Sequence, residues 1–364
     1  MLQLPDFPWD SIGEATARAR SHPDGFIDLS VGSPVDPTPA VVAAALAEAA
    51  VAPGYPTTIG TVELRDAVVA WFERRRGVPG LTPEHVIPSI GSKELIGLLP
   101  LALGLGPGDT VVHPELAYPT YAVGAAAVGA TALPADVPAS WPDSTRLVWL
   151  NSPGNPDGRV LDVPELRAAV ARARELGAVI VGDECYAELN WSGPDATPSI
   201  LQPEVVGDSR AGVLAVYSLS KRSNLAGYRA GIVAGCSRLI GEVLAVRKHL
   251  GLMVPLPVQH AMAAAFADDA HVEAQRERYR ERRRRLRAGL ERAGFVIDDS
   301  EAGLYLWATR GEPARDTLSL LADLGILAAP GDFYGARGAR HVRLALTASD
   351  EKIRDAVARL ELLG

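Results

Sequence analysis

Three stretches of the sequence place reactive side chains directly after short apolar runs. Asn151 follows LVWL, Asp183 follows AVIVG, and Lys221 comes soon after VLAVY. In open α/β sheets, ligands bind outside the carboxyl ends of the strands, so an amide, a carboxylate and an amine in these positions are expected to converge. A lysine buried in such a pocket loses its proton more easily, and a neutral amine can form a Schiff base with a carbonyl compound. The sequence therefore predicts carbonyl chemistry at Lys221.

Two further charges could complete such a site. Arg229 stands eight residues after Lys221, beyond the flexible Gly227, and a guanidinium group can hold a phosphate through a forked contact. Asp183 offers the opposite charge. A buried carboxylate beside a pyridine nitrogen keeps that nitrogen protonated, which makes the ring an electron sink. These are the residue types that a phosphate-bearing pyridine cofactor requires.

The elements that must position these residues alternate between short apolar runs and helical patterns, which is typical of parallel βαβ units. We expect strands rich in Val, Ile and Leu, covered on both faces, at residues 110–113, 146–150, 178–181 and 212–217. A helix between two of them has Asp162 and Glu165 at capping-box spacing and stops at Gly177. Another helix is expected with Pro39 at its first position.

Beyond about Pro257 the pattern changes to that of an α+β unit. It comprises a long charged helix, a strand at 304–307, a helix from Ala314 and a strand at 341–346. We therefore expect a large α/β domain over residues 31–255, carrying the cofactor, and a small α+β domain formed by residues 1–30 and 256–364. Two prolines within residues 253–257 favour a hinge there.

The overall composition limits the kinds of partner. A formal net charge of -8 argues against a nucleic-acid-binding surface. The arginine-rich run QRERYRERRRRLRAGLER, at 275–292, is interleaved with glutamates, while Tyr279, Leu286 and Leu290 recur at helical spacing. We interpret this run as the solvated face of a helix.

Other features predict a cytoplasmic protein without a metal centre. Cys185 and Cys236 are too few for a disulfide framework and lack CxxC spacing. The N-terminal residues do not resemble a signal peptide, and the longest apolar stretch, at 95–106, is too short and too interrupted to span a membrane. The seven histidines show no metal-binding spacing.

Longer motifs surround the candidate residues. NSPGNPDG at 151–158, DECY at 183–186 and SLSKRSNLAGYRAG at 218–231 resemble, in order and spacing, the fold-type I class I/II aminotransferases. Shorter motifs fall where that family has its Tyr-Gly, phosphate-loop and C-terminal arginine motifs: GYPTTIG at 54–60, GSKE at 91–94 and HVRLAL at 341–346. The resemblance extends over nearly the whole chain. It implies an α/β class and the pyridoxal-phosphate-dependent transferase fold of aspartate aminotransferase, with a mostly parallel central sheet.

The resemblance also implies roles around the cofactor ring. Lys221 would carry pyridoxal 5'-phosphate as a Schiff base and later move the proton between the substrate and the cofactor. Asp183 would pair with the pyridinium nitrogen, and Asn155 and Tyr186 would hydrogen-bond the phenolic oxygen of the ring. Tyr118 resembles the aromatic residue that stacks on the ring.

Further residues would bind the phosphate and the substrate. The family pattern points to a phosphate site formed by the backbone amides of Ser92 and Lys93 at a helix start, together with Ser218, Ser220 and Arg229. Tyr55 would reach that phosphate from the other subunit of a homodimer. Arg343 matches the arginine that forks onto the α-carboxylate of the substrate, helped by the backbone near Gly32 and by Asn155.

Simpler interpretations exist for single residues. Lys221 alone could be a surface lysine, Asp183 a helix cap, and Asn155 with the following proline a turn. Either Tyr118 or Tyr121 could be a core ring, and Arg343 could pair with a structural carboxylate. The joint spacing of the motifs favours the site instead.

Other functions were weighed as well. Ser218 to Lys221 also reads S-x-x-K, the acyl-serine signature of penicillin-binding proteins, but no SDN or KTG follows. A cofactor-binding effector domain of a regulator resembles these transaminases, although no DNA-binding extension is visible here. A pyridoxal-phosphate-dependent C-S β-lyase starts from the same carbanion, so the anchor residues do not distinguish it from a transaminase.

Within the family, the chain is similar to the actinobacterial succinyldiaminopimelate aminotransferases of lysine biosynthesis. GSKE and the ending HVRLALTASDEKI carry this similarity. It implies amino transfer between glutamate and N-succinyl-2-amino-6-oxopimelate, both acidic, for which Lys93 and Arg343 would provide a local basic pocket. Aspartate, alanine, kynurenine and LL-diaminopimelate aminotransferases remain alternatives, because they share most of the same anchors.

Overall fold

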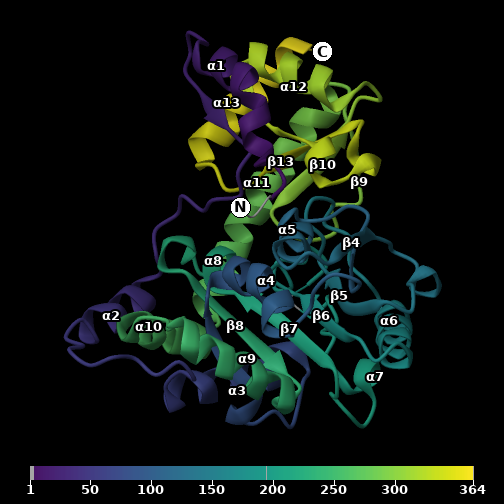
Figure 1. The fold of residues 1–364 in the computed structure, drawn as a ribbon. Helices are drawn as coiled ribbons and strands as arrows, with labels where there is room; N and C mark the ends of the chain where they lie inside the picture. The colour runs from purple at the N-terminus through teal and green to yellow at the C-terminus, as the bar shows by residue number, and fades with distance from the viewer. Residues whose placement is uncertain (1–3, 194, 364) are drawn as a thin grey trace.

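The protein consists of two layered units joined by a long helix (Figure 1). We describe it from a computed structural model that covers residues 4–193 and 195–363. The larger unit occupies the lower part of Figure 1, and the smaller unit, which contains both the N-terminal helix and the C-terminal helix, lies above it. The candidate residues come from both units.

A seven-stranded sheet forms the centre of the large unit. Its order is β2 (Val86–Ile90), β8 (Ala230–Gly235), β7 (Val213–Ser218), β6 (Val179–Asp183), β5 (Thr145–Asn151), β3 (Thr110–His113) and β4 (Thr131–Pro134). Only β8 runs antiparallel to its neighbours; the remaining pairs among these strands are parallel. The α/β class and the mostly parallel central sheet are therefore confirmed, and each of the four expected strands lies within one or two residues of its predicted position.

Helices cover both faces of this sheet, which explains why its strands are continuously apolar. One face packs against α4 (Gly91–Ala102), α5 (Thr120–Ala127) and α9 (Ser237–Leu250). The other face packs against α2 (Ala40–Glu48), α3 (Val62–Arg76), α6 (Val163–Glu175), α7 (Pro203–Val206) and α10 (Leu256–Ala267). All six residues of β7 are buried between these two layers. A strand held on both faces fixes the position of the residues that follow it.

Local sequence signals place several helix ends. The side chain of Asp162 accepts a hydrogen bond from the Glu165 nitrogen, and Glu165 caps Asp162 in return, so the predicted capping box is confirmed at the start of α6. Pro39 differs from its expected place, because it is the N-cap of α2 and the helix begins at Ala40. Its extended backbone, with ψ of 140°, precedes the helix instead of belonging to it.

The small unit combines two short sheets with helices. β1 (Ile27–Asp28) pairs in parallel with β11 (Ile326–Leu327). The other sheet is antiparallel, in the order β12 (Ala329–Pro330), β13 (His341–Ala345), β10 (Tyr305–Thr309) and β9 (Val296–Asp298). Helices α1 (Gly13–Arg20), α12 (Ala314–Asp323) and α13 (Asp350–Leu360) complete the unit, and the N-terminal α1 packs against α12 (Figure 1).

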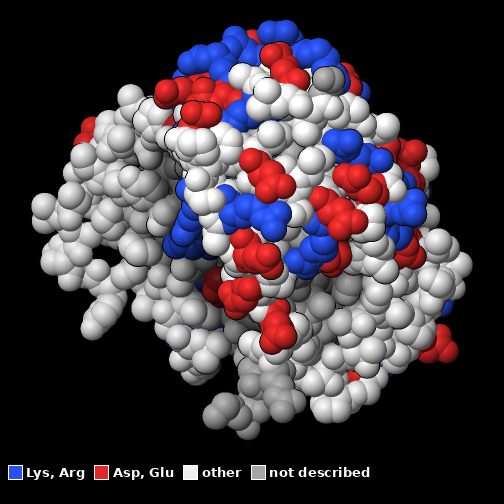
Figure 2. Space-filling view, turned by 90° about the horizontal axis from the view of Figure 1, so that it is seen from above, with Lys and Arg blue, Asp and Glu red and all other residues white. Residues whose placement is uncertain are grey.

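The long helix α11 (Ala270–Arg292) carries the arginine-rich run. Tyr279, Leu286 and Leu290 are buried along one side of it, as the spacing predicts. Its arginines pair with acids, and Arg282 reaches both Asp36 and Asp350. On the face seen in Figure 2, basic side chains gather along one edge with acidic ones directly beside them. Within α11 itself, Arg284 is 69% exposed and pairs with Glu281, which supports a solvated helix face, whereas Arg282 is buried.

Packing shows where the chain crosses between the units. Residues 251–255 join α9 to α10, and α10 packs closely on α2 and α3 of the large unit. The helix α11 then contacts α8 (Leu219–Arg222) at one end and α13 at the other. The chain therefore leaves the large unit along α11, while the expected division at residue 255 stays a prediction. No helix in the described part of the chain is long and apolar enough to cross a membrane.

Candidate active site

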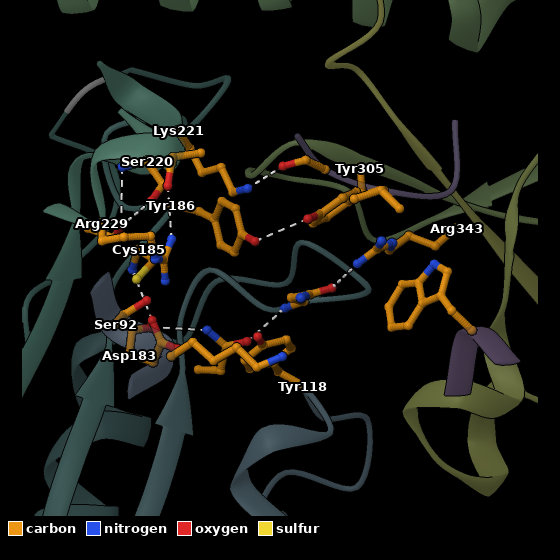
Figure 3. Close-up of a pocket in the computed structure, with 18 of the residues that line it drawn as sticks. Ser92, Tyr118, Asp183, Cys185, Tyr186, Ser220, Lys221, Arg229, Tyr305 and Arg343 are labelled. Atoms are coloured by element: carbon orange, nitrogen blue, oxygen red, sulfur yellow. Dashed lines mark hydrogen bonds between the residues drawn. The ribbon is translucent and has the colours of Figure 1, made fainter. Parts of the chain in front are cut away.

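A cavity of about 460 Å³ lies where the carboxyl ends of β5, β6 and β7 face the small unit (Figure 3). Every candidate residue except Tyr55 lines it: Gly32, Ser92, Lys93, Tyr118, Asn155, Asp183, Tyr186, Ser218, Ser220, Lys221, Arg229 and Arg343. Figure 3 shows Lys221 and Arg229 on the side of the large unit, with Tyr305 and Arg343 opposite them. The structure thus gathers residues that are more than 300 positions apart in the chain.

Lys221 enters this cavity from the short helix α8, immediately after β7. Its Nζ atom donates a hydrogen bond to the carbonyl oxygen of Gly32. Burial is the largest influence on this amine and lowers the pKa of Lys221, and the cations Arg343 and Arg229 act in the same direction. A lysine with a lowered pKa keeps more of its neutral, nucleophilic form, as Schiff-base formation requires.

Asp183 ends β6 and is fully enclosed. Its Oδ2 accepts a 2.8 Å hydrogen bond from the Tyr121 hydroxyl, and its Oδ1 accepts a 3.2 Å bond from the Cys185 nitrogen. Burial raises the pKa of Asp183, because no cation compensates its charge inside the described protein. A protonated ring nitrogen placed here would supply that missing charge.

The side chain of Asn151, the last residue of β5, holds the turn that follows this strand. Asn151 Oδ1 accepts a 2.8 Å hydrogen bond from the Asn155 nitrogen, and Asn151 Nδ2 donates to the Asp183 carbonyl oxygen at 3.1 Å. The side chain of Asn155 is thereby directed to the cavity, where its Oδ1 accepts a 2.7 Å bond from Arg343 Nη1. Asn151 thus supports the site as well as lining it.

Arg343 extends from β13 into the same cavity. Its Nη2 donates a 2.6 Å hydrogen bond to the Ser30 carbonyl oxygen, and its guanidinium carbon lies 3.8 Å from the centroid of the Tyr305 ring. The residue is 3% exposed, its Nε has no hydrogen-bond partner, and no carboxylate lies within ion-pairing distance in the described residues. A buried cation without a counter-ion is costly, so this position calls for an anionic ligand.

A second group of hydrogen-bond donors lies at the start of α4. Gly91 has φ of +72°, and a Cβ atom there would overlap the guanidinium group of Arg229. A Cβ atom on Gly231 would come within 2.9 Å of the Ser92 nitrogen. The two glycines therefore let Arg229 and the free amides of the helix start approach one point.

Two serine hydroxyls that line the same cavity add to these donors. Ser218 is the N-cap of α8, and its Oγ accepts a 3.1 Å hydrogen bond from the Ser220 nitrogen. The same Oγ lies 2.8 Å from Ser220 Oγ. Hydroxyls, a guanidinium group and helix-start amides are the donors that bind phosphate.

The structure separates the two tyrosines that the sequence leaves ambiguous. Tyr118 lines the cavity, while Tyr121 is completely buried beneath it. Tyr121 stacks on Trp149 with centroids 5.1 Å apart and an interplanar angle of 20°. Tyr121 is thus a core ring that supports Asp183, and Tyr118 is the ring available to a ligand.

Sequence reasoning missed one phenol in the centre of the cavity. The Tyr305 hydroxyl lies 3.2 Å from that of Tyr186, and a Cβ atom on Gly32 would overlap the Tyr305 phenol (Figure 3). Burial alone would raise the pKa of Tyr305. Arg343 and Lys221 stabilise the phenolate, so the pKa of Tyr305 is lowered overall. A strand at 304–307 is predictable, but its inward face depends on pairing with β13.

Other lining residues were missed for similar reasons. They are Phe7, Trp9, Val31, Cys185 and Ala226. Cys185 stands inside the DECY motif, which offered a signal, whereas Phe7 and Trp9 belong to an N-terminal segment with no distinctive pattern.

Tyr55 does not reach the cavity of its own chain. It lies in the loop between α2 and α3 and is 95% exposed. Its expected role in a partner's site therefore stays a prediction.

Comparison with known proteins gives a consistent result. The family described as aminotransferase class I and II matches residues 24–360. The chain is 57% identical to the 4-dedimethylamino-4-oxo-anhydrotetracycline transaminase OxyQ of Streptomyces rimosus, over 99% of this chain and all of that protein. It is also 57% identical to a protein of Mycobacterium tuberculosis named as a probable aminotransferase, over 98% of this chain and 85% of that protein.

A solved structure extends the similarity to the fold. The structure from Thermus thermophilus described as a probable N-succinyldiaminopimelate aminotransferase is 29% identical to this chain. It matches with a TM-score of 0.89 and covers 98% of this chain and 100% of that one. The architecture is thus shared across nearly the full length of both chains.

Proposed function

The chain belongs to the pyridoxal-phosphate-dependent class I and II aminotransferases, and on this premise we propose that it transfers an amino group between glutamate and N-succinyl-2-amino-6-oxopimelate. The proposal depends on the burial of Arg343. This cation pairs with no carboxylate of the described residues, and it lines the same cavity as Lys221. An α-carboxylate would provide the missing charge and place the α-carbon near the amine.

The residues present fit pyridoxal phosphate. The anion site at Gly91, Ser92 and Arg229 suits the phosphate, and the uncompensated carboxylate of Asp183 suits a protonated pyridine nitrogen. We assign the ring face to Tyr118 and the ring oxygen to Tyr186, both of which line the cavity. When bound, this cofactor withdraws electrons from the α-carbon of an attached amino acid.

Lys221 and its neighbours would carry the proton transfer. Lys221 Nζ would hold the cofactor covalently and, as a free amine, would take the proton from the α-carbon of the substrate. The lowered pKa of Lys221 favours the free amine needed for both tasks. The hydroxyls of Tyr186 and Tyr305 lie 3.2 Å apart and form a hydrogen-bonded pair in the same cavity as this amine.

Binding of the substrate carboxylate would rest on Arg343 and Asn155. Arg343 Nη1 and Nη2 are held by Asn155 Oδ1 and by the Ser30 carbonyl oxygen. These contacts fix the plane of the guanidinium group before the substrate arrives. A fixed plane supports bidentate binding of a carboxylate with little loss of entropy.

A second cation supports a dicarboxylic substrate. Lys93 lines the cavity, with its Nζ 5.9 Å from the centroid of Tyr118 and 5.8 Å from that of Phe7. No carboxylate of the described residues lies within ion-pairing distance of it. We assign the distal carboxylate of glutamate or of the oxo acid to Lys93, which explains how an acidic chain can bind acidic substrates. The name of the Thermus relative is consistent with this assignment.

We further propose a cytoplasmic homodimer with shared sites. The 95% exposure of Tyr55 supports a partner that covers it and receives its hydroxyl near the cofactor phosphate. Mixing Lys221→Ala subunits with Tyr55→Ala subunits should restore part of the activity, because one of the two sites in a mixed dimer then has both residues. A fully active monomer in sedimentation experiments would contradict the assignment of Tyr55.

A second candidate is transfer to a ring ketone. The relative from Streptomyces rimosus carries the name of a 4-oxo-anhydrotetracycline transaminase, and aromatic rings of Phe7, Trp9 and Tyr118 line this cavity. Such a substrate would stack on these rings. A C-S β-lyase remains a third candidate, which would break the C–S bond and release a thiol, ammonia and an oxo acid without needing an amino acceptor.

The deciding experiment is the visible spectrum of the protein loaded with cofactor, before and after excess glutamate. Bleaching of the yellow band by glutamate, followed by recovery with N-succinyl-2-amino-6-oxopimelate, supports the proposal. Recovery with a tetracycline-type ring ketone alone would select the second candidate. A band that glutamate does not change would reject glutamate as the donor.

A further inference from the structure

The residues that follow Lys221 are tied to the segment that joins the two units. Arg222 Nη2 donates a 2.8 Å hydrogen bond to the Ala265 carbonyl oxygen, near the end of α10. Two residues further along, Asn224 Nδ2 donates a 3.0 Å bond to Gln275 Oε1 on α11. Helix α10 packs on the large unit and α11 leads to the small unit, so the chain after Lys221 is held at their junction.

The residue between these two contacts belongs to a chain of hydrogen bonds, which we call the junction relay. Ser223 Oγ lies 2.8 Å from His271 Nε2, and His271 Nδ1 lies 2.6 Å from Asp268 Oδ2. Asp268 Oδ2 also accepts a 3.1 Å bond from the His271 backbone nitrogen in the first turn of α11. Since Ser223 is the C-cap of α8, the relay links the helix of the cofactor lysine to the start of α11.

The direction of these hydrogen bonds follows from the carboxylate. Ionised Asp268 only accepts, so His271 Nδ1 carries the proton of a neutral ring and Nε2 accepts from the Ser223 hydroxyl. Protonation of the ring would turn Nε2 into a donor. The Ser223 hydroxyl would then lose its acceptor at a position that is 0% exposed, where water cannot replace it.

The charges around His271 favour the neutral ring. The charged groups that face it are Asp268 from the end of α10, Arg222 from α8 and Glu188 from the segment after β6. Burial is the largest influence and lowers the pKa of His271, and Arg222 acts in the same direction, while Asp268 and Glu188 oppose them. The pKa of His271 is lowered overall from 6.5, so the ring accepts the serine proton at neutral pH.

A serine, a histidine and an aspartate in this order also occur in hydrolases, where the serine attacks the substrate. Ser223 has no access to a substrate, because it is completely buried and does not line the active-site cavity. The geometry therefore fits residues that hold the backbone in place, and it does not fit a second reactive centre.

The helix that carries Lys221 depends on such contacts. It has only four residues, and a helix of this length is not stable by itself. Its ends are fixed by Ser218, the N-cap, and by Ser223, the C-cap. A displacement of about 1 Å at a reacting group can lower a rate by about 10²-fold, so a shift at the Ser223 end would misplace the amine.

We propose that His271, oriented by Asp268, is a positioning residue that acts on Lys221 through the Ser223 hydroxyl. The inference rests on the proposed role of Lys221 as the anchor of the cofactor and adds to it a residue from the helix that joins the units. Because α11 also packs on α13 of the small unit, the relay gives the amine and Arg343 a common support.

Two replacements of His271 separate the hydrogen bond from the bulk of the ring. His271→Gln keeps a neutral acceptor for the Ser223 hydroxyl, whereas His271→Phe keeps an aromatic ring and removes the acceptor. In single-turnover bleaching of the cofactor-loaded protein by glutamate, His271→Phe should lower the maximal rate by about tenfold to 10²-fold, and His271→Gln by less than about threefold. The glutamate concentration that gives half the maximal rate should change little in either variant, because Arg343 is untouched.

Loading of the cofactor gives a measurement that is independent of turnover. The visible band should appear more slowly in His271→Phe than in His271→Gln when pyridoxal phosphate is added to the cofactor-free protein. His85→Gln is the matched control, because His85 Nδ1 lies 2.9 Å from Thr82 Oγ1 in an exposed hydroxyl–imidazole pair outside the cavity. It should leave both rates unchanged.

The pH profile distinguishes positioning from a purely structural role. The maximal rate of the wild type should show a step on the acid side, below the ordinary histidine value of 6.5, as His271 gains its proton. His271→Gln cannot titrate there and should lack this step. A structural role alone would lower the unfolding midpoint of both variants and leave the shape of the profile unchanged.

The outcomes separate this inference from the proposed function. An unchanged bleaching rate in folded His271→Phe, an equal loss in His271→Gln, or the same acid step in His271→Gln and the wild type would overturn the junction relay. If circular dichroism shows that His271→Phe does not fold, Ser223→Ala replaces it with the same expected loss. A wild-type protein that forms no visible band with added cofactor would overturn the proposed function instead.

Discussion

The hydroxyl of Tyr121 donates a 2.8 Å hydrogen bond to Oδ2 of Asp183, which lines the active-site cavity, while Tyr121 is fully buried beneath it. Tyr121 is itself held by stacking on Trp149 in the core of the sheet. The carboxylate proposed to control the cofactor ring is thus positioned by the rigid interior of the large unit. Catalytic groups on such elements are placed more precisely than those on loops.

The first prediction concerns this carboxylate. Asp183→Ala should still bind pyridoxal phosphate through the anion site but lose transamination by at least 10²-fold, because the ring nitrogen would no longer be held protonated. Tyr121→Phe keeps the carboxylate and should retain far more activity. Single-turnover bleaching by glutamate measures both variants, and an unchanged rate in Asp183→Ala would remove the proposed ion pair.

The second prediction concerns the amine that anchors the cofactor. Lys221→Ala should lose the visible band of the covalently bound cofactor together with all transamination, since no other lysine has its amine in this position beside Gly32. Lys93→Ala is the comparison, because Lys93 lines the same cavity and its loss should leave the band in place. Normal turnover by Lys221→Ala would overturn the mechanism.

The third prediction concerns the carboxylate of the substrate. Arg343→Gln should lower kcat/KM for glutamate by about 10² to 10³, which corresponds to about 3–4 kcal/mol for a buried charge pair. Arg343→Lys should recover only part of this loss, because an ammonium group cannot form the planar forked contact. The position of the cofactor band should not change in either variant. An unchanged KM would assign Arg343 to structure alone.

The fourth prediction concerns a buried network behind Lys221. Glu188 accepts a hydrogen bond from Tyr217 at 2.8 Å and pairs with Arg75 at 3.0 Å and with Arg222, the residue after Lys221. Glu188→Gln leaves the buried Arg222 without its one ion-pair partner among the described residues and should destabilise the protein by about 3 kcal/mol. Glu242→Gln, which breaks an exposed pair with Arg238, should cost less than about 1 kcal/mol. Urea denaturation compares the two variants, and equal midpoints would refute the role of the network.

The same network gives a dependence on pH. Burial alone would raise the pKa of Glu188, but Arg222 and Arg75 outweigh it and lower that pKa below 4.5. The ionised network therefore stabilises the fold at neutral pH, and its contribution is lost as pH falls below that value. The acid limb of stability should be flatter in Glu188→Gln than in the wild type.

The fifth prediction concerns Asp157, in the turn after β5. Burial, with the nearby charge of Asp299, raises the pKa of Asp157 to about 6. Between the ordinary value of 3.8 and 6 the folded state binds more protons than the unfolded state, so stability falls as pH rises through this window. Asp157→Asn should match the wild type near pH 4 and exceed it by up to about 2 kcal/mol at pH 7. Thermal melts at both pH values measure this, with the exposed Asp143→Asn as control; a constant difference would contradict the raised pKa.

The sequence by itself determined the central strands, the capped helix after Asp162 and the order of the motifs that carry Asp183 and Lys221. These features are local. Apolar runs, capping residues and short motifs depend on neighbours within a few positions, so the chain records them directly. The same motifs led to the family and to the residues gathered in the cavity.

The tertiary structure alone decided which further groups meet at that cavity. Tyr305 meets Tyr186 across 119 positions, and Arg343 meets Asn155 across 188. Only the strand pairing directs Tyr305 inward, and only the packing of Tyr121 on Trp149 leaves Tyr118 for the ligand. Trp9 and Tyr334 likewise line one cavity although they come from opposite ends of the chain. Contacts of this kind depend on how whole elements pack, and no local pattern in the sequence specifies them.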